Sequence, residues 1–170
     1  MSAQDSKLFV ISGPSGAGKG TLVTRVRERR SNLGLTVSAT TRAPRKGEVD
    51  GVNYFFLTRE EFDRRVANGE FVEWAEVHGN CYGTLVSEVQ SKLASGSSLI
   101  LEIDVQGALQ VKERFPEAVL IFIKPPSLEV LRERLVGRGT ETPETIELRM
   151  ANAADELALA DRYDDVVVND

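Results

Sequence analysis

GPSGAGKGT, at residues 13–21, is the stretch that decides the fold of this chain. The apolar run Leu8–Ile11 leads straight into it, and a helix-like segment, Leu22–Arg30, follows it. The glycines within the stretch let the backbone turn its N–H groups inward, because no side chain obstructs the turn. Together with the N-terminus of the following helix and the ammonium of Lys19, those N–H groups form a site for a polyphosphate. The strand–loop–helix pattern is that of a phosphate-binding P-loop.

One position of the loop departs from the strict pattern. That pattern has Ser or Thr directly after the lysine, whereas this chain has Gly20 there and a hydroxyl one residue later, at Thr21. The alternative interpretation is a glycine-rich turn that matches the pattern by chance. The context argues against it, because the loop lies between an apolar strand and a helix, as the motif requires.

The composition is that of one soluble globular domain, with 41% hydrophobic and 28% charged residues in 170. The formal net charge of −5 argues against a general binder of nucleic acids or anionic membranes. A single cysteine, Cys81, excludes an intrachain disulfide and fits a reducing compartment. The first residues are polar, and no apolar run approaches membrane-spanning length. We therefore expect a cytoplasmic protein without nucleic-acid or membrane partners.

Strand-like and helix-like segments alternate along the chain, which predicts an α/β fold with a parallel central sheet flanked by helices. Two apolar runs, Ser98–Ile103 and Ala118–Ile123, are typical of strands buried inside such a sheet. The shorter strands expected at residues 36–39, 52–57 and 71–77 predict a small mixed or antiparallel subdomain over the cleft. We expect residues 78–83 to form a turn after it.

Capping signals mark several of the expected helices. Thr58 and Glu61 form a capping box, and Ser127, after a strand that two prolines end, is the expected N-cap of the next helix. Thr142 as N-cap and Pro143 at the first helical position begin the last long helix. The helices after the first are expected at residues 58–69, 86–94, 108–114, 127–136 and 142–160, and a last strand is expected at residues 166–168.

Three clusters of polar residues follow the predicted strands or flank the helices. Arg134, Arg138 and Arg149 surround a glycine-containing connector, from which guanidinium groups can swing onto phosphates. The alternative is a solvated helix face with a basic loop. A second cluster can bind a further phosphate, or can be a basic surface loop; it comprises Ser38, Thr41, Arg42, Arg45 and Tyr54.

The third cluster is acidic and consists of Glu73, Glu102 and Asp104. Either Glu102 or Asp104, directly after a buried strand, can serve as the acid beside Mg²⁺. A carboxylate can also accept hydrogen bonds from the N1–H and N2–H₂ groups of guanine. The alternative interpretation of Glu73, taken alone, is that it is an outward-facing strand residue without a function. Because ligands of parallel sheets bind at the carboxyl ends of the strands, we expect these clusters to converge on one cleft.

The chain resembles the guanylate kinase family over nearly its whole length. The resemblance rests on seven stretches in the family's order: GPSGAGKGT (13–21), SATTRAPRKGEVDGVNYFF (38–56), GEFVEWAEVHGNCYGT (69–84), LEIDVQG (101–107), IKPPS (123–127), RLVGRGTET (134–142) and VVVND (166–170). It implies transfer of the ATP γ-phosphate to GMP with Mg²⁺, on a P-loop NTPase-type sheet. It further implies a single domain with three parts: a core (1–35, 85–126 and 150–170), a GMP-binding subdomain (36–84) and a lid (127–149).

The resemblance also assigns roles to individual positions. The ATP side comprises Gly13, Pro14, Ser15, Gly16, Ala17, Gly18, Lys19, Gly20 and Thr21, with Asn169 near the adenine. The catalytic clamp on the phosphates comprises Lys19, Arg134, Arg138 and Arg149. The phosphate of GMP is assigned to Arg42, Arg45, Tyr54 and Tyr82, and its guanine to Ser38, Glu73, Thr84 and Glu102, with Asp104 beside them.

The chain departs from the family pattern at several places. The ending GKGT is more typical of adenylate kinases, and it makes Thr21 the expected metal-binding hydroxyl. Glu102 stands where some members have Asp, and the family continues into a final helix that we expect to be missing after Asp170. Two alternatives stay open: another nucleoside monophosphate kinase, and an inactive kinase-like interaction module. Monomer and homodimer are both compatible with the sequence.

Overall fold

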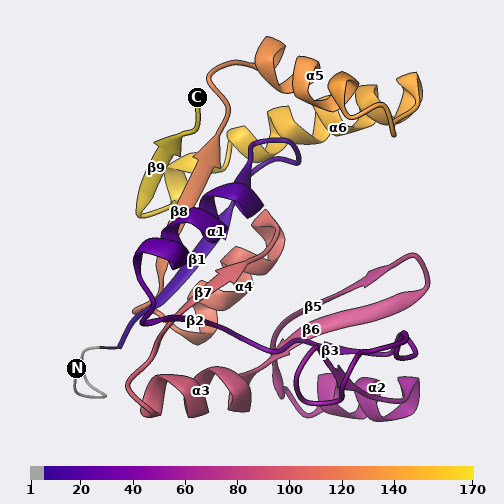
Figure 1. Cartoon of the computed structure of the whole chain (residues 1–170), viewed down its shortest axis with the longest axis vertical. Coiled ribbons are helices and arrows are strands. Elements are labelled where there is room, and N and C mark those ends of the chain that lie inside the picture. Colours follow the sequence, from indigo (N-terminus) through magenta and orange to yellow (C-terminus); the bar gives the residue numbers. More distant parts are fainter. Residues whose placement is uncertain (1–5) are drawn as a thin grey trace.

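The computed structural model describes residues 6–170, which form two β-sheets (Figure 1). The larger sheet has the strand order β2-β7-β1-β8-β9 and consists of β1 (Leu8–Ser12), β2 (Leu33–Leu35), β7 (Ser98–Glu102), β8 (Val119–Lys124) and β9 (Asp165–Val168). The smaller sheet has the order β4-β3-β6-β5 and consists of β3 (Ala39–Thr40), β4 (Phe55–Phe56), β5 (Phe71–Val77) and β6 (Asn80–Leu85).

Helices connect and cover the strands. They are α1 (Lys19–Arg29), α2 (Arg59–Ala67), α3 (Val86–Ala94), α4 (Val105–Arg114), α5 (Leu128–Gly137), α6 (Pro143–Leu157) and the short 3₁₀ helix η2 (Ala160–Arg162). Figure 1 shows the α5–α6 pair at one end of the larger sheet and the small sheet with α2 at the other end. Among the described residues, no helix has the length and apolar character needed to cross a bilayer.

All strand pairs of the larger sheet are parallel, so the predicted α/β fold class is confirmed. Its central strand, β1, pairs with β7 on one side and β8 on the other, and Val10 is opposite Leu101 and Leu120. These three side chains are at most 3% exposed. A strand buried on both faces needs a continuous apolar run, which explains why these segments were recognisable in the sequence.

The parallel sheet brings its strand ends to one edge. The P-loop follows β1, Glu102 ends β7, and Lys124 ends β8. Because the three strands are neighbours and run in the same direction, the segments that follow them begin side by side. The fold therefore gathers the basic P-loop and an acidic strand end at the same edge.

The prediction of a turn over residues 78–83 was wrong. The turn is confined to His78 and Gly79, which have φ values of 51° and 82°, and β6 begins directly afterwards. Such a two-residue connection matches the twist of an antiparallel hairpin. Gly83 led to the turn prediction, because glycine is typical of turns. In the structure, a Cβ at this position would lie 2.7 Å from the Phe71 ring. The glycine is therefore required by close packing within the sheet and does not mark a turn.

Other expected boundaries also shifted. Of the strand expected at residues 36–39, only Ala39 lies in a strand, the two-residue β3, and β2 precedes the expected segment and joins the larger sheet beside β7. The strand expected at 52–57 shrinks to β4, which pairs in parallel with β3 and makes the small sheet mixed. Helix α4 begins three residues earlier than expected, because Asp104 accepts a hydrogen bond from the Gly107 N–H at 2.7 Å and caps it.

The three predicted N-caps are confirmed. The side chains of Thr58, Ser127 and Thr142 accept hydrogen bonds from backbone N–H groups in the first turns of α2, α5 and α6. Helix α2 needs its cap to begin at the right place, because it carries Phe62 into the small-sheet core. The Phe62 ring is fully buried, with its centroid 4.4 Å from that of Phe71.

We predict that Thr58→Ala lowers the free energy of unfolding by about 1 kcal/mol, because the Glu61 N–H loses its acceptor. Urea denaturation followed by circular dichroism measures the change. Thr58→Ser is the matched control, since it keeps the hydroxyl and is expected to retain most of the stability. Equal losses in the two variants would contradict the capping role of the hydroxyl.

Candidate active site

Two glycines let the P-loop backbone approach its neighbours closely. A Cβ on Gly13 would lie 2.1 Å from the Ile123 carbonyl oxygen of β8. A Cβ on Gly18, whose φ is 87°, would lie 2.4 Å from the side-chain nitrogen of Asn169. Any other residue at Gly13 would force two backbone segments apart, and one at Gly18 would displace the Asn169 side chain and be strained at that φ. These contacts seat the loop between the ends of β8 and β9.

The Lys19 ammonium folds back onto the loop. Its Nζ donates hydrogen bonds to the carbonyl oxygens of Gly13, at 2.6 Å, and Pro14, at 3.3 Å. Burial lowers the pKa of Lys19, while the nearby carboxylates of Glu102 and Glu156 oppose that shift. A desolvated cation at the start of α1 interacts more strongly with an anion than an exposed one does.

Glu156, on α6, is a half-buried carboxylate that the sequence analysis missed. Burial raises its pKa, while the positive charge of Lys19 opposes the shift. No spacing signal in the sequence links a residue of this last helix to the P-loop lysine. The proximity arises because α6 returns toward the larger sheet before η2 and β9, as Figure 1 shows.

Two of the three candidate arginines contact the P-loop itself. Arg149 donates from Nη1 to the Ser15 hydroxyl at 2.7 Å, and its Nε lies 3.3 Å from Glu141. Arg134 donates to the Gly16 carbonyl at 3.4 Å. Arg138 is exposed at the end of α5. The structure therefore brings Arg134 and Arg149 to the loop and leaves Arg138 on the surface.

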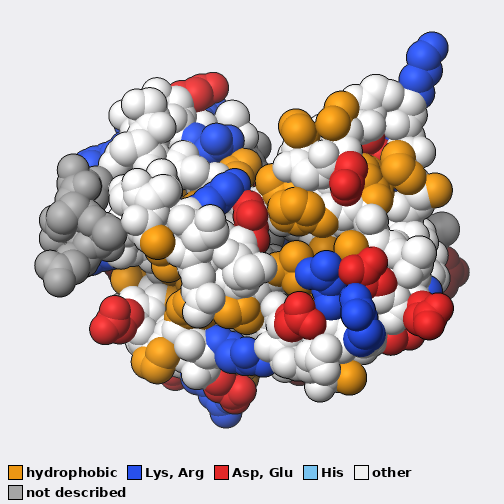
Figure 2. Space-filling view, turned by 90° about the horizontal axis from the view of Figure 1, so that it is seen from below, with side chains coloured by type: hydrophobic (Ala, Val, Ile, Leu, Met, Phe, Trp, Pro, Cys, Tyr) orange, Lys and Arg blue, Asp and Glu red, His pale blue; other side chains and the backbone are white. Residues whose placement is uncertain are grey.

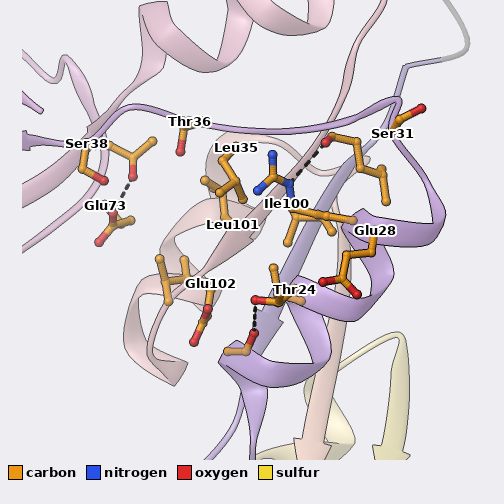
Figure 3. A pocket seen from close by; sticks show the side chains of 16 residues that line it. Thr24, Glu28, Ser31, Leu35, Thr36, Ser38, Glu73, Ile100, Leu101 and Glu102 are labelled. Atoms are coloured by element: carbon orange, nitrogen blue, oxygen red, sulfur yellow. Dashed lines mark hydrogen bonds between the residues drawn. The ribbon is translucent and has the colours of Figure 1, made fainter. Parts of the chain in front are cut away.

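A cavity of about 730 Å³ opens beyond the P-loop, between α1, β7 and the small sheet (Figure 3). Gly20 lines it on the P-loop side. The sequence-predicted guanine residues meet here, since Ser38, Glu73, Thr84 and Glu102 all line this cavity. Figure 3 shows Ser38 and Glu73 together on one side, and Glu102 on another wall.

The Glu73 carboxylate is held in place by its neighbour on β6. Thr84 donates its hydroxyl hydrogen to Oε1 of Glu73 at 2.8 Å. Burial raises the pKa of Glu73, and the hydrogen bond from Thr84 partly opposes the shift. The exposed Glu102 ends β7, and a Cβ on Gly20 would lie 3.8 Å from its Oε1. The cavity thus presents two hydrogen-bond-accepting carboxylates from different sheets.

Asp104 is engaged differently from these two. Its side chain caps α4, so one of its oxygens is committed to the backbone N–H of Gly107. Thr21 lies exposed in the first turn of α1. Neither residue lines the cavity that holds Glu73 and Glu102.

A separate basic cluster lies on the small sheet. Arg42 makes a two-pronged ion pair with Glu48, with N–O distances of 2.9 and 3.0 Å. Its guanidinium carbon is 5.2 Å from the Tyr54 ring centroid, and the Tyr54 and Tyr82 rings are 6.3 Å apart. The side chain of Arg45 is exposed nearby. The structure therefore gathers Arg42, Arg45 and Tyr54 of the expected phosphate cluster. Ser38 instead lines the cavity with Glu73, and the Thr41 hydroxyl accepts a hydrogen bond from the Cys81 N–H.

Glu48 is a second residue that the sequence analysis missed. Its carboxylate also accepts a hydrogen bond from the Arg45 backbone N–H at 2.7 Å. Pairing with Arg42 lowers the pKa of Glu48 and raises the pKa of Arg42. The sequence did carry a signal for this pairing. A single acidic residue in a basic loop has arginines within a few positions with which it can form an ion pair.

The face of the molecule seen from below carries mixed charge. Figure 2 shows Lys and Arg side chains next to Asp and Glu side chains on this face, with apolar side chains between them. Basic groups there lie beside acidic ones and do not form one continuous patch.

Comparison with known proteins identifies the family. The family model described as guanylate kinase matches residues 5–170. A guanylate kinase of Gloeobacter violaceus is 59% identical over 165 residues, covering 97% of this chain and 80% of that protein. One of Halalkalibacterium halodurans is 55% identical over 170 residues, covering 100% of this chain and 83% of that protein.

A solved structure agrees with these relatives. The crystal structure of guanylate kinase from Anaplasma phagocytophilum is 38% identical and superimposes with a TM-score of 0.66. The match covers 97% of this chain and 77% of that one. With the P-loop, the acidic cavity and the arginine cluster in the arrangement described above, the sequence and structural matches lead to one conclusion: this chain belongs to the guanylate kinase family.

Proposed function

We propose that this chain transfers the γ-phosphoryl group of ATP to GMP, giving ADP and GDP, and that the residues described above divide this task. The observation that carries the proposal is the cavity beside the P-loop, in which Glu73 and Glu102 present acceptors from two sheets. Family membership supports the reaction, and the chemistry of the cavity supports the choice of acceptor nucleotide.

Guanine fits this set of groups better than adenine does. Guanine offers N1–H and N2–H₂ donors beside an O6 acceptor, so the carboxylates can accept from it while Ser38 donates to O6 and Thr84 keeps its hydrogen bond to Glu73. Adenine lacks the N1 donor and would leave at least one desolvated carboxylate unpaired. An unpaired buried acceptor costs more than the bond itself, so such a site rejects the wrong base strongly.

The arginine cluster on the small sheet is the proposed site for the phosphate of GMP. Arg42, Arg45, Tyr54 and Tyr82 supply the donors. Glu48 holds the Arg42 guanidinium by two of its nitrogens and so limits the orientations of its remaining N–H groups. A pre-oriented fork loses less side-chain entropy when a phosphate binds.

The P-loop is the proposed site for the phosphates of ATP, with Lys19, Arg134, Arg138 and Arg149 as the cationic clamp. ATP and GMP repel each other, and the phosphoryl group in transfer needs positive charge and positioning more than an acid–base pair. The contacts of Arg134 and Arg149 with the loop support this assignment, because their charge is already beside the proposed phosphate site.

The residues at the loop also fit a magnesium ion that accompanies ATP. Among residues 6–170, no three His, Cys, Asp or Glu side chains are grouped to hold a metal. Magnesium in kinase sites is usually bound through substrate phosphates, water and one or two protein oxygens. The exposed Thr21 hydroxyl would be the protein ligand, and Glu102 or Asp104 would act from the strand end. When bound, the ion neutralises phosphate charge.

We further propose that residues 36–84 close over the core when GMP binds, and that residues 127–149 act as a lid. The two phosphate clusters are carried by different sheets, so an approach of the small sheet to the P-loop would bring the two nucleotides together for transfer. Closure excludes water, which would otherwise compete with GMP as the acceptor.

A coupled assay with ATP and each of GMP, AMP, CMP and UMP tests the proposed function. We expect turnover with GMP and little with the other three. Preference for AMP would favour an adenylate kinase, for which Gly20 is the supporting feature. No turnover with any acceptor would favour an inactive interaction module.

We predict that Lys19→Met and Arg138→Ala lower kcat far more than they change GMP affinity, since both charges act on the phosphoryl group in transfer. For Arg138 a loss on the order of 10³-fold is expected. Steady-state kinetics measures both parameters. Arg132→Ala is the matched control on the same helix, because Arg132 is exposed and pairs with Glu147. Normal kcat with a raised KM would refute the assignment.

We predict that Glu73→Gln lowers kcat/KM for GMP by roughly 10- to 100-fold, because a donor replaces half of the acceptor capacity. Activity with AMP should stay low or rise slightly, so the ratio of kcat/KM for GMP to that for AMP falls. Glu76→Gln, at an exposed position of the same strand, is the control. If both Glu73→Gln and Glu102→Gln keep the wild-type ratio of kcat/KM for GMP to that for AMP, the prediction is wrong and base recognition is assigned to Ser38 and Thr84.

The raised pKa of Glu73 predicts that GMP binding weakens in mild acid. The carboxylate accepts from guanine only when ionised, and it gains its proton at a higher pH than an ordinary glutamate does. Titration calorimetry with GMP from neutral to mildly acidic pH measures the effect. Glu73→Gln controls for titration of the GMP phosphate, and a wild-type profile parallel to that of the variant would contradict the prediction.

A further inference from the structure

Asn169, directly after β9, links the P-loop to two other parts of the core. Its backbone N–H donates to the Lys124 carbonyl at the end of β8, at 2.9 Å. Its side-chain Nδ2 donates to the Ala17 carbonyl of the P-loop, at 2.8 Å. Its own carbonyl accepts from Nη2 of Arg134 on α5, at 3.1 Å. One residue thereby connects β8, the P-loop and α5.

The amide of Asn169 packs directly on the P-loop backbone. Gly18 has a φ of 87°, and a Cβ there would lie 2.4 Å from Nδ2 of Asn169. Ala17 is fully buried, so its carbonyl depends on a protein partner. The amide supplies that partner at a point where glycine leaves just enough room.

The bond from Asn169 constrains the orientation of one peptide group. In a planar trans peptide, the carbonyl and the following N–H point in opposite directions. Holding the Ala17 carbonyl toward Asn169 therefore turns the Gly18 N–H the other way. Arg134 holds the preceding carbonyl, that of Gly16, at 3.4 Å. Two successive carbonyls of the loop are thus held by Asn169 and by Arg134, which are hydrogen-bonded to each other.

We infer that Asn169 is a positioning residue for ATP, whose amide aims the Gly18 N–H at the phosphates by holding the Ala17 carbonyl. The inference rests on the proposed role of the P-loop as the ATP-phosphate site. It differs from an adenine contact, because it concerns the phosphates alone. A ligand that has the phosphates but no base should therefore lose as much binding affinity as ATP does when Asn169 is replaced.

The test is titration calorimetry of Asn169→Asp with a non-hydrolysable ATP analogue, inorganic tripolyphosphate and GMP. The variant keeps the side-chain shape but turns a carboxylate oxygen toward the Ala17 carbonyl. We expect both phosphate ligands to bind about 10- to 100-fold more weakly, as for an unpaired buried acceptor. The dissociation constant of GMP should stay within about twofold, which a general loss of structure would not allow.

Asn152→Asp is the matched control, since it adds the same charge at an exposed position of α6. Asn169→Ala is the second variant, which removes the donor without adding charge and should weaken both phosphate ligands in the same way. Amide hydrogen exchange of the ligand-free proteins adds a readout independent of binding. The loop amides should exchange faster in both Asn169 variants than in wild type or Asn152→Asp.

Several outcomes would overturn the inference. Equal affinities of wild type and both Asn169 variants would refute it while leaving the ATP role of the loop intact. Weaker binding of the ATP analogue with unchanged binding of tripolyphosphate would assign Asn169 to the adenine. Unfolding of both variants would show that Asn169 is required for folding and not for positioning the loop. Failure of the wild type to bind the ATP analogue would refute both the proposed ATP role of the loop and the inference about Asn169.

Discussion

Burial of β1 between β7 and β8 is the constraint on which the rest of the structure depends. Val10 is fully buried at its centre, and burying a valine side chain contributes about 1.5–3 kcal/mol. The strand ends where Gly13 passes so close to the Ile123 carbonyl that a Cβ has no room. The P-loop therefore begins at a fixed point and in a fixed direction, and α1 begins from it with Lys19 in its first turn.

The site that forms around this point draws charged groups from both sheets. The larger sheet holds Lys19 beside the P-loop and Glu102 at the end of β7, while the small sheet brings Glu73 to the cavity and carries the Arg42 cluster. Burial shifts the pKa of Lys19 downward and that of Glu73 upward, so each ionised group has lost part of its hydration. Partly dehydrated charges interact strongly with ligands, which makes the cavity suited to recognising a nucleotide.

The sequence was most informative where local chemistry decides the conformation. The P-loop, the buried strands and the caps at Thr58, Ser127 and Thr142 were all predictable from short patterns. Strand β6 was not, because Asn80 and Gly83 are typical of turns. Its formation depends on pairing with β5, and the glycine is needed because the Phe71 ring occupies the space beside it. Such a requirement comes from a neighbouring strand and leaves no local signal.

The sequence by itself determined the fold class, the family and the residue types available for phosphate and guanine recognition. The tertiary structure decided which of those groups meet. Pairing of Arg42 with Glu48 depends on how one loop folds back on itself. The contact of Asn169 with Ala17 joins residues 152 positions apart, and it exists because β9 docks beside β8 and ends next to the loop. Contacts at such separations depend on packing of the whole sheet, which no local pattern records.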